Sequence, residues 1–153
     1  MKVHQLEKKS TKLVSLLKVS LSDTFILYLK TLNYHWHVTG PAFYTLHEAF
    51  ELQYKDLAEA IDELAERLRQ LNEIAPATTQ ALLNHATLKE GNTIPTAGDM
   101  LKQLIADHTQ VAQECKQVIE VANNLNHETT ADLLIKRVAF HEKTIWMLKS
   151  SLP

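Results

Sequence analysis

Glycine and proline are scarce in this chain, with only 3 glycines and 4 prolines among 153 residues. Because these residues interrupt helices, the stretches between them are free to be helical. Residues 1–39, 42–75 and 99–152 contain neither, and the last stretch is broken only by the polar segment NNLNHETT at 123–130. The sequence therefore predicts four long helices.

Cysteine, long apolar runs and excess charge are also lacking. The single Cys115 excludes an intrachain disulfide and a cysteine-based zinc motif, so we expect a reducing compartment and a cytoplasmic protein. No apolar run reaches the roughly 18 residues that cross a membrane. The polar N-terminus, MKVHQLEKKSTK, is not typical of a signal peptide, and we expect no membrane association.

A net charge of −2 excludes a broad basic surface for nucleic acid, so any DNA contact has to be local.

The composition, 45% hydrophobic, is typical of one globular domain, here spanning residues 1–153. Apolar residues recur at the helical period in the first two long segments. They are Leu13, Leu16, Leu17, Phe25, Leu29, Leu32 and Trp36, then Phe43, Phe50, Leu57, Ile61, Leu64 and Leu68. The connector 76–98 contains TTQALLNHA, which predicts a short extra helix, and Thr96 with Asp99 predicts a helix cap. We expect an all-α fold: a four-helix bundle with a short extra helix between helices 2 and 3.

Histidines crowd around a Gly-Pro break in the segment NYHWHVTGPAFYTLH, at residues 33–47. His35 lies five residues before Gly40 and His47 seven after it, so a turn there leaves them only about 3 Å apart along the helix axes. Glu51 follows His47 by one helical turn, on the same face. These three side chains are candidates for one half of a metal site.

The same helix carries a second acidic pair, Asp62 and Glu66, four residues apart. Fifteen residues of helix, about 22 Å, separate His47 from Asp62, so the two groups cannot hold one ion within one chain. The small residues Ala58 and Ala65 on this flank indicate a subunit interface. If two copies pack antiparallel about a two-fold axis, His35, His47 and Glu51 of each copy meet Asp62 and Glu66 of the other. Two equivalent sites then form. Imidazole with carboxylate and no thiolate suits iron, manganese or zinc.

Each of these residues, taken alone, has an ordinary structural interpretation. Charged pairs four residues apart usually lie on a solvated face, and a histidine near a helix end is usually a surface or capping residue. His37 has no partner at a matching spacing. We therefore interpret it as a structural residue, or as one that supports a metal ligand without binding the ion itself. We expect Trp36 and Cys115 in the core, where aromatic rings and free cysteines are usually buried.

The pattern as a whole resembles the Dps family, mini-ferritins also called DNA-binding proteins from starved cells. The similarity begins near residue 10 and rests on NYHWHVTGPAFYTLH, FELQYKDLAEAIDELAERL and TADLLIKRVAFHEKTIWML. The resemblance implies that the four-helix bundle is ferritin-like. It also implies an intersubunit ferroxidase site that binds two iron ions, oxidises Fe2+ to Fe3+ and accepts zinc or manganese as substitutes. It implies a homododecamer that uses hydrogen peroxide or dioxygen, stores ferric mineral and protects DNA from oxidative damage. The residues at matching positions are His35, His47, Glu51, Asp62 and Glu66.

One ligand departs from the family pattern, which usually has aspartate where this chain has Glu51. The extra methylene shifts the carboxylate by about 1.5 Å. The larger ferritins are a poorer match, because the chain lacks their Glu-x-x-His motif. Trp36, beside the site, is a candidate electron donor. Glu128 and Asp132, near the start of the fourth helix, are candidates for an iron-uptake pore; the alternative is that both complement the helix dipole.

DNA compaction with little or no ferroxidase activity is the alternative function. Some family members bind DNA through lysine-rich tails, and residues 1–9 form a candidate mobile tail here. The charge would come from Lys2, Lys8, Lys9 and Lys12, multiplied by the copies in an oligomer, and would make the protein nucleoid-associated. A purely structural helical oligomer is the third hypothesis.

Overall fold

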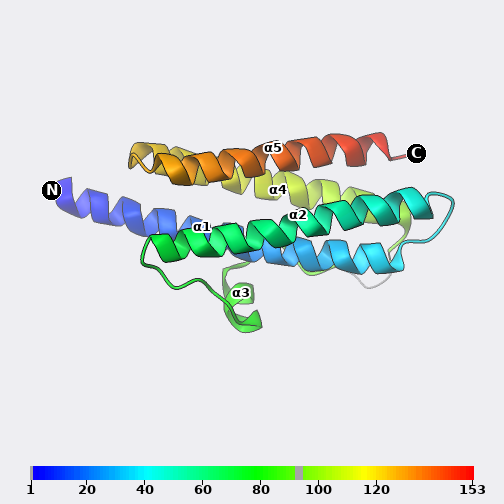
Figure 1. Cartoon of the computed structure of the whole chain (residues 1–153), viewed down its shortest axis with the longest axis horizontal. Helices are drawn as coiled ribbons and strands as arrows, with labels where there is room; N and C mark the ends of the chain where they lie inside the picture. Colours follow the sequence, from blue (N-terminus) through cyan, green and yellow to red (C-terminus); the bar gives the residue numbers. More distant parts are fainter. Residues whose placement is uncertain (1, 92–94) are drawn as a thin grey trace.

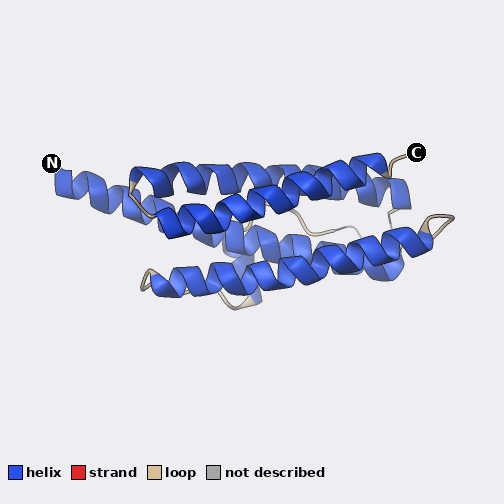
Figure 2. Ribbon diagram, turned by 45° about the horizontal axis from the view of Figure 1, so that its top comes forward, coloured by secondary structure: helices blue, strands red, loops and turns tan. Residues whose placement is uncertain are grey.

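The computed structural model describes residues 2–91 and 95–153, with side chains from residue 10 onward. The helices, in chain order, are α1 (Lys2–His37), α2 (Phe43–Gln70), α3 (Thr79–His85), α4 (Ala97–Asn124) and α5 (Glu128–Ser150) (Figure 1). No strand occurs in this part of the chain (Figure 2). The four long helices, the breaks between them and the short extra helix are confirmed.

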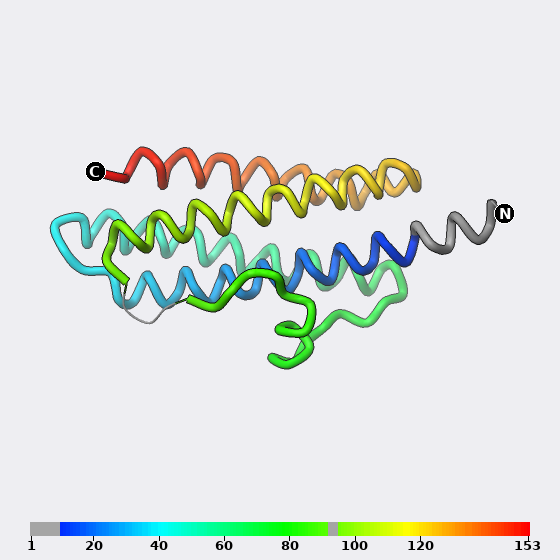
Figure 3. Tube along the Cα trace, turned by 180° about the vertical axis from the view of Figure 1, so that it is seen from behind, coloured from blue at the N-terminus to red at the C-terminus, as the bar shows by residue number. Residues whose placement is uncertain are grey.

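The long helices form two antiparallel hairpins, α1 with α2 and α4 with α5, which pack against each other along α1 and α4 (Figure 1). The segment between α2 and α4 returns along the bundle, and its helix α3 lies outside α1 (Figure 3). Because of this long crossover, α2 and α4 run in the same direction. None of the helices in the described residues is long and apolar enough to cross a bilayer.

The core runs along the centre of the four long helices. Four positions of the apolar stripe predicted for α2 are fully buried: Phe50, Leu57, Leu64 and Leu68. Cys115 is buried as expected. The expectation for Trp36 is wrong, because this side chain is 62% exposed in the last turn of α1. Helical periodicity placed it with the apolar residues, but its face of α1 points away from the bundle.

Left-handed backbone conformations mark the turns. Asn72 (φ 61°) follows α2 and Asn126 (φ 58°) follows α4. The N–H group after each asparagine donates to a carbonyl in the last turn of the helix, at 3.0 and 2.9 Å. Gly40 (φ 104°) lies in the turn between α1 and α2, in a conformation that side chains with a Cβ atom rarely adopt.

Side-chain hydrogen bonds fix both ends of the segment between α3 and α4. The carboxylate of buried Asp23, on α1, accepts hydrogen bonds from the N–H groups of Thr87 (2.7 Å) and Leu88 (2.8 Å). At the other end, the Thr96 hydroxyl accepts from the N–H of Asp99 at 3.2 Å, the cap that the sequence predicts. The crossover is therefore anchored to α1 and to the start of α4.

A buried pair of histidines joins α4 to α5. The Nδ1 atoms of His108 and His141 lie 2.8 Å apart, and both side chains are fully buried. One Nδ1–H must donate to the lone pair of the other ring. Burial lowers the pKa of His108 to about 3 and that of His141 well below its usual value, and the Arg137 cation contributes to both shifts. Both rings are therefore neutral near pH 7.

We expect the free energy of unfolding to fall as the pH drops below 6.5, where unfolded histidines gain protons. Unfolding then lets His108 and His141 take up protons that the core excludes. This lowers the free energy of unfolding by about 1.4 kcal/mol per pH unit for each histidine. For His108 the loss continues down to its folded pKa of about 3. Glu114 reduces the measured slope, because burial raises its pKa to about 7 and it stays protonated in the fold.

Urea unfolding between about pH 7 and pH 5, at fixed protein concentration, measures this slope. The matched variant replaces both histidines with leucine (His108→Leu, His141→Leu). Its stability should rise as the pH falls, because the two proton-excluding histidines are gone and the opposite effect of Glu114 remains. An equal loss of stability in both proteins would contradict the assignment.

Candidate metal centre

The turn between α1 and α2 brings His35 and His47 into contact. Nδ1 of His35 lies 2.8 Å from the carbonyl oxygen of His47, and Nδ1 of His47 lies 2.7 Å from the carbonyl oxygen of His35. The carbonyl of Gly40 accepts from the N–H of Phe43 at 3.0 Å and closes the turn. The two histidines, which the sequence places at similar heights along the helices, therefore hold each other across it.

These hydrogen bonds determine which ring nitrogen is available to a ligand. A carbonyl oxygen can only accept, so Nδ1 of each ring carries the proton and donates it. In the neutral imidazole, Nε2 then keeps its lone pair, which is the form that binds a metal ion. His35 and His47 are therefore both prepared to bind through Nε2, with their orientation fixed by the opposite backbone.

Ring packing fixes the same two side chains further. The rings stack with their centroids 3.8 Å apart and an interplanar angle of 17°. Phe43 stacks on His47 at 5.1 Å, and Tyr54 meets His35 edge-on at 5.2 Å. His35 is only 8% exposed, whereas His47 is half-buried. Both imidazoles thus have little freedom to rotate.

Glu51 lies one turn beyond His47 on α2, and its carboxylate accepts a hydrogen bond from the Lys55 ammonium. The pKa of Glu51 is lowered, first by the hydrogen bond and charge of Lys55 and then by smaller contributions from His35 and His47. The carboxylate is therefore within electrostatic reach of both imidazoles, but a lysine neutralises it.

Asp62 and Glu66 lie farther along α2, and both are exposed. The helix separates Asp62 from His47 by about 22 Å. Within the described residues of one chain, no three histidine, cysteine or acidic side chains are placed to hold a metal ion. The structure thus brings together His35 and His47, with Glu51 beside them, and leaves Asp62 and Glu66 apart.

Glu66 also lines a surface cleft of about 230 Å³ between α2 and α5. The same cleft contains Asp132, whose carboxylate lies 3.7 Å from the Lys136 ammonium. Glu128 is exposed in the first turn of α5, where it complements the helix dipole, and it does not line this cleft. One predicted site ligand and one predicted pore residue therefore share a single cleft.

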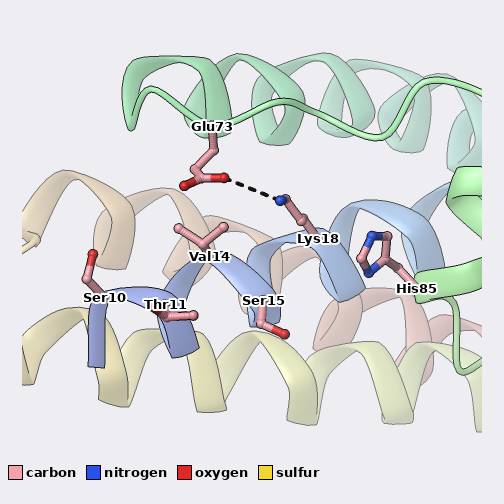
Figure 4. A pocket seen from close by; sticks show the side chains of 7 residues that line it. All are labelled: Ser10, Thr11, Val14, Ser15, Lys18, Glu73 and His85. Atoms are coloured by element: carbon pink, nitrogen blue, oxygen red, sulfur yellow. Dashed lines mark hydrogen bonds and ion pairs between the residues drawn. The ribbon is translucent and has the colours of Figure 1, made fainter. Parts of the chain in front are cut away.

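A larger hollow of about 490 Å³ lies between α1, the segment after α2 and the end of α3 (Figure 4). Lys18 and Glu73 form an ion pair across it at 3.3 Å, and His85 stands near the lysine (Figure 4). Its other lining side chains are three hydroxyls and a valine, and none of the predicted metal ligands lines it. Because its one carboxylate is already paired, it lacks a metal donor set.

Three side chains around the histidines were not predicted: Phe43, Tyr54 and Lys55. Lys55 follows Glu51 by four residues, the spacing of a helical ion pair, so the sequence contains a signal for it. Phe43 precedes His47 by four residues on α2, so its stacking has the same kind of local signal. The contact of Tyr54 with His35 depends on how α1 and α2 pack, which has no such signal.

The two residues that follow His35 differ in their surroundings. Nδ1 of exposed His37 lies 2.8 Å from the carbonyl oxygen of Asn33 in its own helix, which is the structural role expected for it. Trp36 has no ring contact with either histidine among the described residues. Its role as an electron donor stays a prediction.

Known proteins of similar sequence and structure cover almost the whole chain. The ferritin-like domain family matches residues 14–152. The DNA protection during starvation protein of Brevibacillus brevis is 37% identical over 137 residues, which are 90% of this chain and 92% of that protein.

Two solved structures share the fold. Dps from Thermosynechococcus elongatus aligns with a TM-score of 0.92 and 32% identity, over 95% of this chain and 93% of that one. A Dps protein from Vibrio cholerae O1, described as a member of a broad superfamily of ferritin-like diiron-carboxylate proteins, has a TM-score of 0.89 and 29% identity, over 94% and 90%. Agreement in sequence and in fold along nearly the full length shows that the chain belongs to the Dps family of ferritin-like proteins.

Proposed function

We propose that this protein oxidises Fe(II) at sites shared between subunits and stores the ferric product in a hollow shell. One observation carries the proposal: the reciprocal hydrogen bonds of His35 and His47 leave both Nε2 atoms free beside the carboxylate of Glu51. Nitrogen and oxygen donors without thiolate suit iron(II) and also accept zinc or manganese. The match to the ferritin-like domain supports iron as the physiological ion.

The second half of each site comes from a neighbouring copy. Antiparallel α2 helices related by a two-fold axis would place Asp62 and Glu66 of one copy beside the histidines of the other. The surface around the turn supports such pairing, because Trp36, Tyr44 and Leu52 are 62%, 79% and 70% exposed. Aromatic side chains such as Trp36 and Tyr44 are enriched at interfaces between proteins. Pairs of this kind build a homododecamer.

In the proposed site, the donor side chains form two binding positions, one for each of two iron ions. His35, with Asp62 and Glu66 of the other copy, holds the tighter ion, and His47 with Glu51 supports the second. Hydrogen peroxide takes one electron from each Fe(II) and two protons, which yields two Fe(III) and two water molecules without hydroxyl radical. The carboxylates stabilise the ferric product with negative charge. Dioxygen is the alternative oxidant.

Removal of Fe(II) and peroxide would protect DNA in the cytoplasm without contact. Direct DNA binding is the alternative. Of the four lysines proposed for it, only Lys12 has a described side chain, and that side chain is exposed. Helix α1 begins at Lys2, and the side chains of Lys2, Lys8 and Lys9 lie outside the described residues, so a tail of residues 1–9 stays a prediction. The net charge of −2 favours iron chemistry over DNA compaction as the main activity.

Replacing His35 with alanine (His35→Ala) should lower the rate of peroxide-driven Fe(II) oxidation by about tenfold or more, because a ligand and its partner hydrogen bond are both lost. The formation of ferric product is measured by its absorbance. His37→Ala is the matched control, since this exposed histidine bonds only to its own helix. Equal rates in both variants would refute the ligand assignment.

Two defective variants should restore each other if the site is shared. One lacks the histidines (His35→Ala, His47→Ala) and the other lacks the acids (Asp62→Ala, Glu66→Ala). In a mixed dimer one site has all its ligands and the other keeps only Glu51, so random co-assembly restores about one quarter of the sites. Fe(II) oxidation by the co-refolded mixture, compared with each variant alone, measures this recovery. No recovery in mixed particles would contradict intersubunit sharing.

The pore assignment predicts that Asp132→Asn slows the initial uptake of Fe(II) several-fold, because an acidic channel concentrates cations. Stopped-flow measurement at low Fe(II) concentration reports this rate. Glu142→Gln is the control, because this exposed acid on the same helix pairs with Lys116 away from the cleft. An unchanged uptake rate in Asp132→Asn would leave only the helix-dipole role.

A further inference from the structure

Among the described residues, Lys55 is the one positive side chain bonded to a candidate ligand of this site. Its ammonium donates to Oε1 of Glu51, four residues earlier on α2. The other such pair on one helix, Asp132 with Lys136, is longer at 3.7 Å and its side chains are 71% and 73% exposed. By contrast, the Glu51 side chain is only 36% exposed.

A lysine at this position competes with any metal ion for the same oxygen atoms. The Glu51 carboxylate also interacts electrostatically with His35 and His47, whose free Nε2 atoms would bind the same ion. A divalent cation cannot share the carboxylate with an ammonium at close range, because like charges repel strongly there. Lysine has a long flexible stem and a strongly hydrated head, so it can leave for solvent when displaced.

We propose that Lys55 is a positioning residue that occupies Glu51 in the iron-free site and makes the second metal ion bind more weakly than the first. This inference rests on the proposed ferroxidase function and assigns a regulator to the same site. The tighter ion depends on His35 and on Asp62 and Glu66 of the other copy, whereas the ammonium of Lys55 is bonded to Glu51. Iron therefore binds in two steps, and the second step requires Lys55 to withdraw.

The raised pKa of Lys55 and the lowered pKa of Glu51 agree with this pairing, since each group's first cause is the hydrogen bond to the other. An ordinary surface pair at this spacing would have no effect on a distant ligand site. Lys55 differs because its partner lies one turn from His47 and within reach of both imidazoles.

Anaerobic titration of the assembled protein with Fe(II), followed by calorimetry, tests the inference. Lys55→Gln should tighten the weaker binding step by about fivefold and leave the stronger step within about twofold. Lys55→Arg keeps the charge and should behave like the unchanged protein. Lys116→Gln removes the same charge from a pair on α4 and α5, and should also change nothing.

A double variant shows whether Lys55 acts through Glu51. In a Glu51→Gln background, Lys55→Gln should have no further effect on either step, because the competing carboxylate is gone. Two-step binding that is lost in His35→Ala but unchanged in Lys55→Gln would overturn this inference alone. Absence of saturable Fe(II) binding in the unchanged protein would overturn both this inference and the proposed function.

Discussion

The antiparallel pairing of α1 with α2 across one short turn is the constraint on which the candidate site depends. His35 and His47 reach each other's backbone only in one register of the two helices. A shift of one residue would rotate either ring by about 100° and break both bonds. Buried core residues such as Phe50 and Leu57 hold this register. The apolar core therefore sets the geometry of a polar site at its edge.

The chain contains two histidine pairs, and their surroundings give them opposite properties. His108 and His141 bond Nδ1 to Nδ1 in the core beside the Arg137 cation, so burial and charge both oppose a further positive ion. His35 and His47 direct Nδ1 to carbonyl oxygens and keep Nε2 free beside a carboxylate. The first pair is suited to packing neutral rings, and the second to accepting a cation.

A single chain holds only half of what the proposed chemistry requires. His47 and Glu51 lie near the start of α2, with His35 beside them on α1. Asp62 lies about 22 Å from His47 along α2 and Glu66 one turn farther, because a straight helix cannot fold back. In the proposed function, sharing the site between copies would couple assembly to activity. In the isolated chain Lys55 balances the charge of Glu51, so the carboxylate is compensated before any metal ion arrives.

The sequence by itself determined the helices, their breaks and the meeting of His35 with His47. Helix formation depends on local backbone preference and apolar spacing, and a tight turn leaves little freedom in how two flanking helices align. The caps at Thr96 and the left-handed turns at Asn72 and Asn126 are local in the same sense.

Only the tertiary structure decided which imidazole nitrogen is free, which ring of α2 meets His35 and which faces are exposed. His108 and His141 are 33 residues apart in sequence, and their contact exists because α4 and α5 pack. Trp36 continues an apolar pattern along α1 but is exposed, because no periodicity states which face a neighbouring helix covers. These features depend on side chains from different helices meeting in space, and that information is not local to any segment.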